Sequence, residues 1–362
     1  MSSFSSSSSD ACLRKQYAIK VAVIPERYGR VLSPCASIRL QAFTQQFAAD
    51  VRYLIAEEVE TFSPDVVLWN RGALATVSAV DALVAVARES GARLIYDLDD
   101  NLLAMDEHPE RESYLDMVGA VRRSIELADE VWCSTQSLVD AVKAAGGAAV
   151  LMPNTLDACM WKRTVSPVEK RPAGAPLKMI YMGTRTHDED YRLLEMALVE
   201  IERIRPGTFS LTLVGVNAQN MVLHPWITVL SPPAHIGASY PAFVRWFVQQ
   251  GPFDLGLAPL IDTRFNRGKS SIKVLDYAAI GLATLASSVA GYLEDFQDDR
   301  VLVQNSVQDW VKALLGALDG TIDLDAVRTR AMDLVTVERF EAAVAERWAR
   351  CHMLPGKPPA HH

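Results

Sequence analysis

The chain has 362 residues, of which 49% are hydrophobic, and a formal net charge of −8. This length and apolar content suffice for two domains, each with its own core, and they exclude a disordered or fibrous protein. The negative charge argues against a nucleic-acid partner, because neutralising phosphates requires a basic face.

The N-terminal segment, the apolar runs and the cysteines bear on where in the cell the protein is expected. Residues 1–15 are rich in serine and lack an apolar stretch, so we expect a disordered tail and not a signal peptide. No segment approaches 18 uninterrupted apolar residues, so the sequence predicts no membrane-spanning helix. The five cysteines form no C-x-x-C pair and are odd in number, which predicts reduced thiols in a cytoplasmic protein; they are Cys12, Cys35, Cys133, Cys159 and Cys351.

Short apolar runs alternate with segments of helical period along the whole chain. The expected strands of the first half are 19–24, 51–55, 65–69, 93–97, 130–134 and 148–152, with helices at 75–90 and 115–128. After a linker at 162–176, strands are expected at 178–182, 210–215, 226–230, 253–258, 282–287 and 300–304. This alternation predicts an α/β protein with parallel sheets and right-handed crossovers. Two Rossmann-like domains fit the chain length, and one large doubly wound sheet is the alternative.

The segment 253–287 combines a buried strand, a basic turn and a helix. Pro259 ends the strand, and a helix is expected to open near Ser270 or Ser271. Free backbone N–H groups at that helix start attract phosphate, and Arg267, Lys269 and Lys273 add full positive charges. Asp276 follows one or two turns later, where a carboxylate can accept hydrogen bonds from sugar hydroxyls. The segment therefore predicts a nucleoside diphosphate site.

This segment resembles the donor-binding element of GT-B glycosyltransferases, especially the family 4 or group 1 enzymes of bacterial polysaccharide synthesis. In that element two acids stand eight positions apart; Asp276 matches the second, which holds the ribose, while Gly268 stands where the first, a sugar-contacting acid, is expected. Two more segments carry the resemblance. ADEVWCS at 128–134 followed by MPNTLD at 152–157 is similar to the crossing between the two domains, and MIYMGTRTHDEDYRLL at 179–194 is similar to the first strand and turn of the C-terminal domain.

The resemblance implies a GT-B fold, in which two Rossmann-like domains with parallel sheets face each other across a cleft. Residues 16–160 would form the acceptor domain, with a final helix at 338–353 packing back on it, and residues 170–337 the nucleotide-sugar donor domain. The implied donor-binding residues are Gly183, Thr184, Arg185, His187, Lys269, Ser270, Ser271, Ile272, Lys273 and Asp276. His187, with Asp188 and Asp190, is also compatible with a plain helix start.

The implied reaction is hexosyl transfer without a metal or cofactor. A nucleotide diphosphate sugar would be the co-substrate, and the acceptor a glycan, a lipid-linked or another hydroxyl compound, in surface polysaccharide or lipopolysaccharide synthesis. The resemblance leaves open a peripheral association with the inner face of the cell membrane, and the sequence predicts no oligomeric state.

Three acids follow the expected strand at 93–97. Asp97, Asp99 and Asp100 fall at a carboxyl strand end, where ligands of parallel sheets gather, so we expect catalytic roles such as general base or orientation of hydroxyls. Capping of the next helix is the alternative. Arg30 and Arg39 lie near the first strand-to-helix connection and are expected to face the acceptor, with a surface position as the alternative.

Other readings of the same segments remain open. The run YDLDDNLL at 96–103 is similar to the nucleophile loop of haloacid dehalogenase-like phosphatases, with Asp97 as nucleophile and Asp99 as acid and base, although Asn101 stands where threonine is usual. The run also contains a D-x-D motif at 97–99, which is similar to the motif with which GT-A glycosyltransferases bind manganese. Gly268 in place of an acid suggests a third class, a non-catalytic nucleotide-sugar-binding protein.

Overall fold

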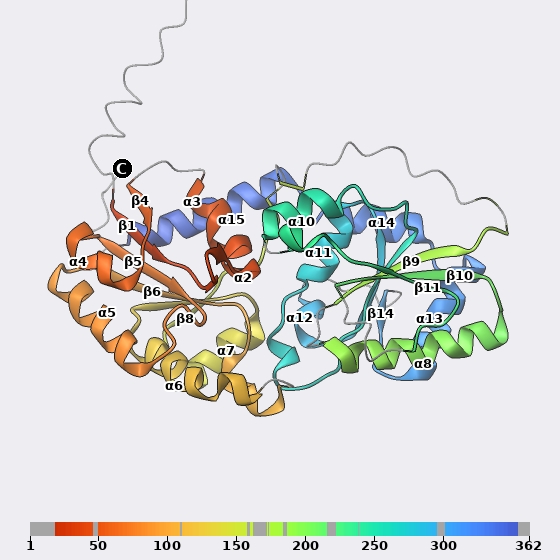
Figure 1. Ribbon diagram of the computed structural model, residues 1–362, viewed down its shortest axis with the longest axis horizontal. Helices are drawn as coiled ribbons and strands as arrows, with labels where there is room; N and C mark the ends of the chain where they lie inside the picture. The colour runs from red at the N-terminus through yellow and green to blue at the C-terminus, as the bar shows by residue number, and fades with distance from the viewer. Residues whose placement is uncertain are drawn as a thin grey trace, which may run out of the picture.

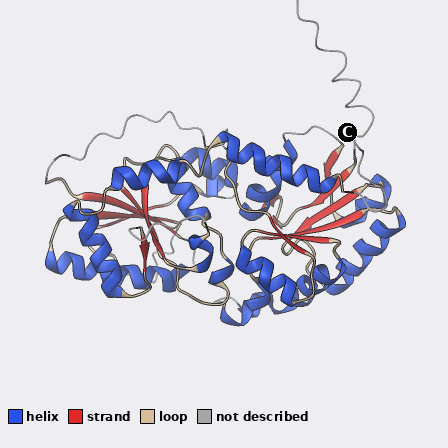
Figure 2. Ribbon diagram, turned by 180° about the vertical axis from the view of Figure 1, so that it is seen from behind, coloured by secondary structure: helices blue, strands red, loops and turns tan. Residues whose placement is uncertain are grey.

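The computed structural model describes residues 19–45, 50–108, 111–157, 160–161, 172, 174–183, 187–215, 222–237, 239–294 and 301–353 (Figure 1). They form two α/β units side by side, each built on a six-stranded parallel sheet with helices on both faces (Figure 2). The expected disordered tail at 1–15 lies outside the described residues.

The N-terminal sheet has the strand order β4-β1-β5-β6-β7-β8. Its strands are β1 (Val21–Ile24), β4 (Val51–Tyr53), β5 (Val66–Asn70), β6 (Arg93–Leu98), β7 (Glu130–Cys133) and β8 (Ala149–Leu151). The central strands β1, β5, β6 and β7 are buried at every position, as their nearly continuous apolar sequence predicts for a parallel sheet covered on both faces. The helices of this unit are α2 (Pro34–Ala36), η1 (Ser37–Gln41), α3 (Ala42–Gln45), η2 (Ala56–Glu58), α4 (Val59–Phe62), α5 (Val77–Glu89), η3 (Leu102–Glu107), α6 (Arg111–Leu127) and α7 (Gln136–Ala144).

The C-terminal sheet repeats this design with the order β11-β10-β9-β12-β13-β14. Its strands are β9 (Leu177–Met182), β10 (Phe209–Val214), β11 (Ile227–Leu230), β12 (Leu255–Ala258), β13 (Ala283–Ser287) and β14 (Leu302–Val303). Its helices are α8 (Asp188–Ile204), α9 (Ala234–Gly237), α10 (Tyr240–Phe247), η6 (Asn266–Gly268), α11 (Ile272–Ala279), α12 (Ala290–Leu293), α13 (Val307–Asp319) and α14 (Leu324–Met332). All twelve sheet strands fall at the places predicted from the sequence, and two separate sheets replace the single-sheet alternative.

One antiparallel hairpin was not predicted. It joins β2 (Arg27–Tyr28) to β3 (Val31–Leu32) directly after β1. Gly29 takes a left-handed conformation in its turn, with φ of 63°, and the turn is exposed.

The last helix, α15 (Val337–Cys351), packs against the N-terminal sheet (Figure 1). Phe340, Val344 and Trp348 share one apolar cluster with residues of β1, β5 and β7. The indole of Trp348 lies 5.0 Å from the ring of Phe43 and donates a hydrogen bond to the Phe43 carbonyl at 3.2 Å. The chain thus returns to its first half at its end.

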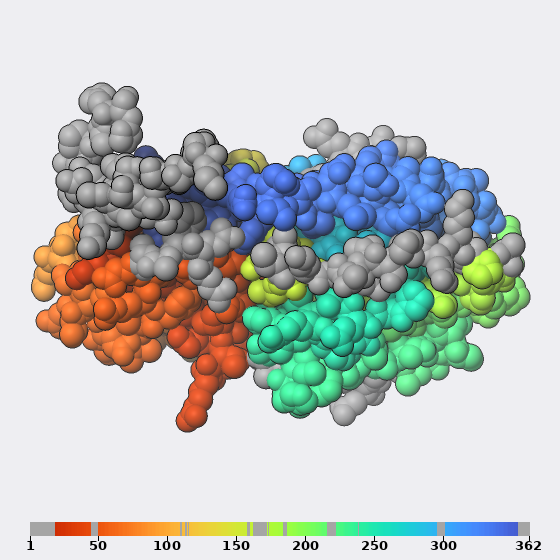
Figure 3. Space-filling model, turned by 90° about the horizontal axis from the view of Figure 1, so that it is seen from above, coloured from red at the N-terminus to blue at the C-terminus, as the bar shows by residue number. Residues whose placement is uncertain are grey.

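The loops at the carboxyl ends of both sheets meet between the units. Thr135, after β7, donates to the Gly268 carbonyl at 3.1 Å, and Asn154, after β8, donates to the hydroxyl of Ser270 at 2.7 Å. Phe265 from the C-terminal unit is buried in the N-terminal apolar cluster, with its ring 4.6 Å from that of His108. In the space-filling view the orange N-terminal half and the green and blue C-terminal half abut (Figure 3).

Within the described ranges, each helix is too short or too polar to cross a lipid bilayer.

We predict that Trp348→Ala destabilises the N-terminal unit. Trp348 is 5% exposed, and its removal leaves a cavity between α15 and Phe43, so the free energy of unfolding should fall by about 3–5 kcal/mol. Urea unfolding followed by circular dichroism measures this change. Val337→Ala, on the same helix at 49% exposure, is the control and should have little effect. Equal stability of both variants would contradict the packing role of α15.

Candidate functional site

The basic turn and helix predicted at 253–287 are present. Strand β12 ends at Ala258, η6 follows, and α11 begins at Ile272 with Ser271 as its N-cap residue. Lys273 lies in the first turn of α11, and its ammonium stands 5.0 Å from the centroid of the Tyr181 ring. Its Nζ is buried and has no hydrogen-bond partner among the described residues. Burial lowers the pKa of Lys273 to about 8.

Asp276 lies three residues further along, on the same face of α11. Its Oδ1 is buried and likewise has no hydrogen-bond partner among the described residues. Burial raises the pKa of this carboxyl to about 8, although the nearby charge of Lys273 lowers it. A buried ammonium and a buried carboxyl, each lacking hydrogen bonds, are costly in a protein interior. A ligand with an anionic group and a hydroxyl would satisfy both.

His187 joins these residues from the connection between β9 and α8. It is the N-cap residue of α8, as the helix-start alternative predicted, and its Nδ1 lies 2.6 Å from Oδ2 of Asp190. Asp190 in turn accepts from the backbone N–H of Ile261 at 2.7 Å. Burial, together with the charges of Lys273 and Lys269, lowers the pKa of His187 to about 3, although Asp190 acts in the opposite direction. His187 thus lies near Lys269 and Lys273, whose positive charges disfavour protonation of its imidazole.

The remaining residues of the predicted donor site are distributed as follows. Gly183 directly follows β9, Ser271 is buried, and Ile272 packs against the apolar cluster beneath α11. The hydroxyl of Ser270 accepts from Asn154, so it is bound to the N-terminal unit. Thr184 and Arg185 lie outside the described residues.

Asp97 and Arg39 form a buried ion pair instead of facing a substrate. Both side chains are 0% exposed, and Nε of Arg39 lies 2.7 and 2.9 Å from the two carboxylate oxygens of Asp97. Nη1 of Arg39 donates to the Met152 carbonyl at 2.8 Å and to the side-chain carbonyl of Asn154 at 2.9 Å. This position does not support a catalytic role for Asp97 or an acceptor contact for Arg39. It also does not support the phosphatase reading, whose nucleophile would be Asp97.

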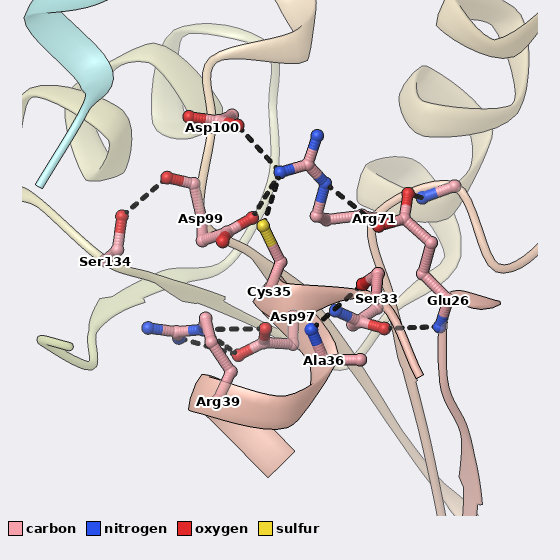
Figure 4. A network of polar contacts seen from close by, with 12 residues as sticks. Glu26, Ser33, Cys35, Ala36, Arg39, Arg71, Asp97, Asp99, Asp100 and Ser134 are labelled. Carbon is pink, nitrogen blue, oxygen red and sulfur yellow. Dashed lines mark hydrogen bonds and ion pairs between the residues drawn. The ribbon is translucent and has the colours of Figure 1, made fainter. Parts of the chain in front are cut away.

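Asp99 and Asp100 belong to a second network, centred on Arg71 (Figure 4). Nη1 of Arg71 lies 3.2 Å from Asp99 Oδ1, 2.7 Å from Asp100 Oδ2 and 2.9 Å from Cys35 Sγ. Arg71 has a left-handed backbone, with φ of 43°, and its Nε faces the carboxylate of Glu26 at 3.6 Å. Burial raises the pKa of Asp99. Burial acts in the same direction on Asp100, but Lys269 and Arg71 outweigh it and lower the pKa to about 2.

The same network contains a set of metal-type ligands. Cys35, Asp99 and Asp100 have ligand atoms within 4.8 Å of one another, the one such group among the described residues. The guanidinium of Arg71 lies between them and already supplies a positive charge there. The set therefore gives no support to the manganese reading of the D-x-D motif.

Arg30 is exposed in the turn of the β2–β3 hairpin, where its surface alternative placed it. Two residues that sequence reasoning missed have central positions, Arg71 and Asn154. Asn154 belongs to the MPNTLD segment, which signalled only a crossing between domains. No local pattern marks Arg71, which follows the buried strand β5 and gains its role from residues 28–45 positions away.

The fold was compared with known proteins. No protein-family model and no curated protein matches the sequence. Among solved structures, HepE of Anabaena in complex with UDP aligns with a TM-score of 0.65 at 14% identity, covering 92% of this chain and 100% of HepE. The lipopolysaccharide outer core galactosyltransferase WaaB aligns with a TM-score of 0.57 at 13% identity, covering 91% of this chain and 100% of WaaB. Apo OtsA aligns with a TM-score of 0.58 at 13% identity, covering 88% and 83% of the two chains.

The chain has the GT-B fold. The fold class and the structural resemblance to GT-B glycosyltransferases expected from the sequence are thereby confirmed.

We predict that Arg39→Ala lowers the free energy of unfolding by about 3–5 kcal/mol, because it leaves the Asp97 carboxylate buried and uncompensated. Chemical denaturation measures the change. The double variant Arg39→Met/Asp97→Leu removes both charges and should recover most of the stability. If Arg39→Ala were as stable as the native protein, the ion pair would not have the structural role assigned here.

Proposed function

We propose that the protein is a glycosyltransferase that moves a hexosyl group from a nucleotide diphosphate sugar to a hydroxyl acceptor. The observation that carries this proposal is the pair Lys273 and Asp276 on α11, whose buried polar atoms lack partners among the described residues of a GT-B fold. The two groups match the two ends of a nucleoside diphosphate, since an ammonium suits phosphate and a carboxyl suits ribose hydroxyls.

The proposed donor site uses the residues around the start of α11. The diphosphate would lie against Lys269, Lys273 and the backbone N–H groups at 270–272, with Asp276 at the ribose. A neutral His187 donates its single N–H from Nδ1 to Asp190, so its Nε2 is an acceptor that can receive a hydrogen bond from a sugar hydroxyl. Gly183, Thr184 and Arg185 remain part of the proposed site through the resemblance of their segment.

The chemistry follows from charge placement. When the glycosidic bond breaks, negative charge grows on the departing diphosphate, and fixed cations stabilise that charge without reorganising. Lys269 and Lys273 supply two positive charges, so we propose that the reaction requires no metal. The neighbours support the donor class: HepE has been crystallised with UDP-glucose, and an E. coli neighbour at a TM-score of 0.55 with UDP-2-fluoro glucose.

The acceptor side of the proposal rests on the N-terminal unit. Residues 16–160, with α15 packed on them, would bind the acceptor, and the exposed Arg30 and the network around Asp99 and Asp100 are the polar groups on offer. The name of WaaB supports an acceptor in lipopolysaccharide or surface polysaccharide synthesis. The cytoplasmic location, at the inner face of the membrane if the acceptor is lipid-linked, remains part of this proposal.

A non-catalytic sugar-nucleotide-binding protein is the second candidate, favoured by Gly268, where the resemblance expects an acid. It would bind the donor but show neither slow donor hydrolysis nor transfer. Incubation with UDP-glucose, UDP-galactose and GDP-mannose, with release of the diphosphate as readout, separates the two candidates.

We predict that UDP, GDP or dTDP raises the melting temperature of the protein, because a ligand that binds only the folded state stabilises it by mass action. Lys273→Ala and Asp276→Ala should each lose most of this shift, since each removes a direct contact with the ligand. Lys312→Ala, which removes an exposed lysine on α13, is the matched control and should keep the full shift. Equal shifts in all four proteins would contradict the assignment of the diphosphate site to Lys273 and Asp276.

We predict that affinity for the diphosphate falls above pH 8. The pKa of Lys273 is lowered to about 8 and that of Asp276 is raised to about 8, so above that pH the free protein loses an ammonium and gains a carboxylate charge. Both changes weaken binding of an anionic diphosphate. Charged groups that act on Lys273 are Asp190, Lys269 and Asp276. The dissociation constant should rise by up to about tenfold per pH unit, measured by titration calorimetry between pH 7 and 9.5.

Lys273→Arg supplies the control for this pH dependence. Arginine keeps its charge throughout this range, so the part of the loss that comes from deprotonation of Lys273 should disappear, whereas the part that comes from ionisation of Asp276 should stay. An unchanged pH profile in that variant would assign the effect to another group.

A further inference from the structure

Gly268 of η6 touches the loop that follows β6 in the N-terminal unit. A Cβ atom at position 268 would lie 2.7 Å from Cβ of Asn101 and 3.4 Å from its backbone nitrogen. The first distance is shorter than a carbon–carbon contact allows, so no side chain fits here while the two units are arranged as observed. The absence of a side chain at 268 therefore lets the N-terminal loop approach the start of the proposed donor site.

The same loop carries Asp100, directly before Asn101. The side-chain exposures of the three acids are 0% for Asp97, 9% for Asp99 and 19% for Asp100, so Asp100 is the most accessible of them. Its electrostatic partners include Lys269 and His187 of the other unit, in addition to Arg71. Asp100 thus stands between the network of the N-terminal unit and the cations of the C-terminal unit.

The side chain of Asp100 is held in place by Arg71 of the N-terminal unit. Oδ2 accepts from Nη1 of Arg71 at 2.7 Å, and Arg71 is itself held by Asp99 and faces Glu26 (Figure 4). On the other side of the loop, Nδ2 of Asn101 donates to the carbonyl of Arg264 at 3.3 Å. A carboxylate anchored in this way is preorganised to accept further hydrogen bonds.

The chemistry of the site limits what Asp100 can bind. An ionised carboxylate only accepts hydrogen bonds and repels phosphate, so it cannot share the diphosphate with Lys269. The ribose is assigned to Asp276, on the helix of the C-terminal unit. Two hydroxyl-bearing groups remain near the diphosphate, the sugar that it carries and the acceptor. The sugar is bonded directly to the diphosphate, so it is the group that must lie beside Lys269, which is an electrostatic partner of Asp100.

We propose that Asp100 binds hydroxyls of the donor sugar, delivering from the N-terminal unit a carboxylate that the C-terminal unit has no room for at Gly268. This inference rests on the proposed function and specifies its substrate recognition. The sugar contact then exists only while the units are closed on each other, because its two halves come from different domains.

Asp100→Asn tests the inference by calorimetric titration with UDP, UDP-glucose, UDP-galactose, GDP and GDP-mannose. We expect the variant to bind the best-bound sugar nucleotide at least about tenfold more weakly, because a hydrogen bond to a charged group is lost. Its affinity for the matching diphosphate should stay within about threefold of the native value. Asp140→Asn, an exposed acid on α7, is the matched control and should change neither affinity.

A second variant tests the same geometry without altering a charge. Gly268→Ala places a methyl group against Asn101, so it should separate the two loops and reduce sugar-nucleotide affinity while diphosphate binding persists. Adding Asn101→Gly removes the clashing Cβ and should restore part of the lost affinity. Melting curves show that each variant is folded.

The outcomes separate this inference from the proposed function. If the native protein binds no nucleoside diphosphate, the proposed function fails and the role of Asp100 fails with it. If diphosphates bind but Asp100→Asn and Gly268→Ala retain native affinity for the sugar nucleotide, or lose sugar nucleotide and diphosphate affinity equally, the role of Asp100 alone is overturned.

Discussion

The buried guanidinium of Arg39 connects the main parts of the molecule. It binds the Asp97 carboxylate at the end of β6, and it holds the Met152 carbonyl and the Asn154 side chain, which lie between the two sheets in sequence. The side-chain NH₂ of Asn154 in turn donates a hydrogen bond to the hydroxyl of Ser270, two residues before the start of α11. Buried ion pairs contribute little net stability when compared with apolar packing, but breaking one is costly, so such pairs fix geometry. Here the geometry that is fixed is the position of the turn before α11 relative to the N-terminal sheet.

Most of the fold was predictable because parallel sheets covered on both faces leave a strong signal. Each strand is a short apolar run, and the intervening helices have room to show their own period. The β2–β3 hairpin and the π-helix at Ser37–Gln41 were not predicted. Each is too short to show a period, and tertiary contacts hold the π-helix, which carries Arg39.

The candidate site was predictable on one side only. Lys269, Lys273 and Asp276 belong to a continuous strand, turn and helix, so local spacing places them together. The three acids after β6 could not be ranked from sequence, since Asp97 still lies within the strand while Asp99 and Asp100 follow it. Their roles depend on which arginine reaches them, Arg39 or Arg71, and those partners are 28–58 positions distant. Long-range pairing of this kind leaves no mark in a local pattern.

Phe265 has a consequence for motion. Its ring belongs to the C-terminal chain but is buried in the N-terminal core, so the domains cannot part without drawing an aromatic side chain into water. Exposing a phenylalanine costs about 2 kcal/mol, which by itself would leave only roughly 3% of the molecules open at any moment. The Phe265 ring therefore opposes separation of the two domains, because opening exposes it to water.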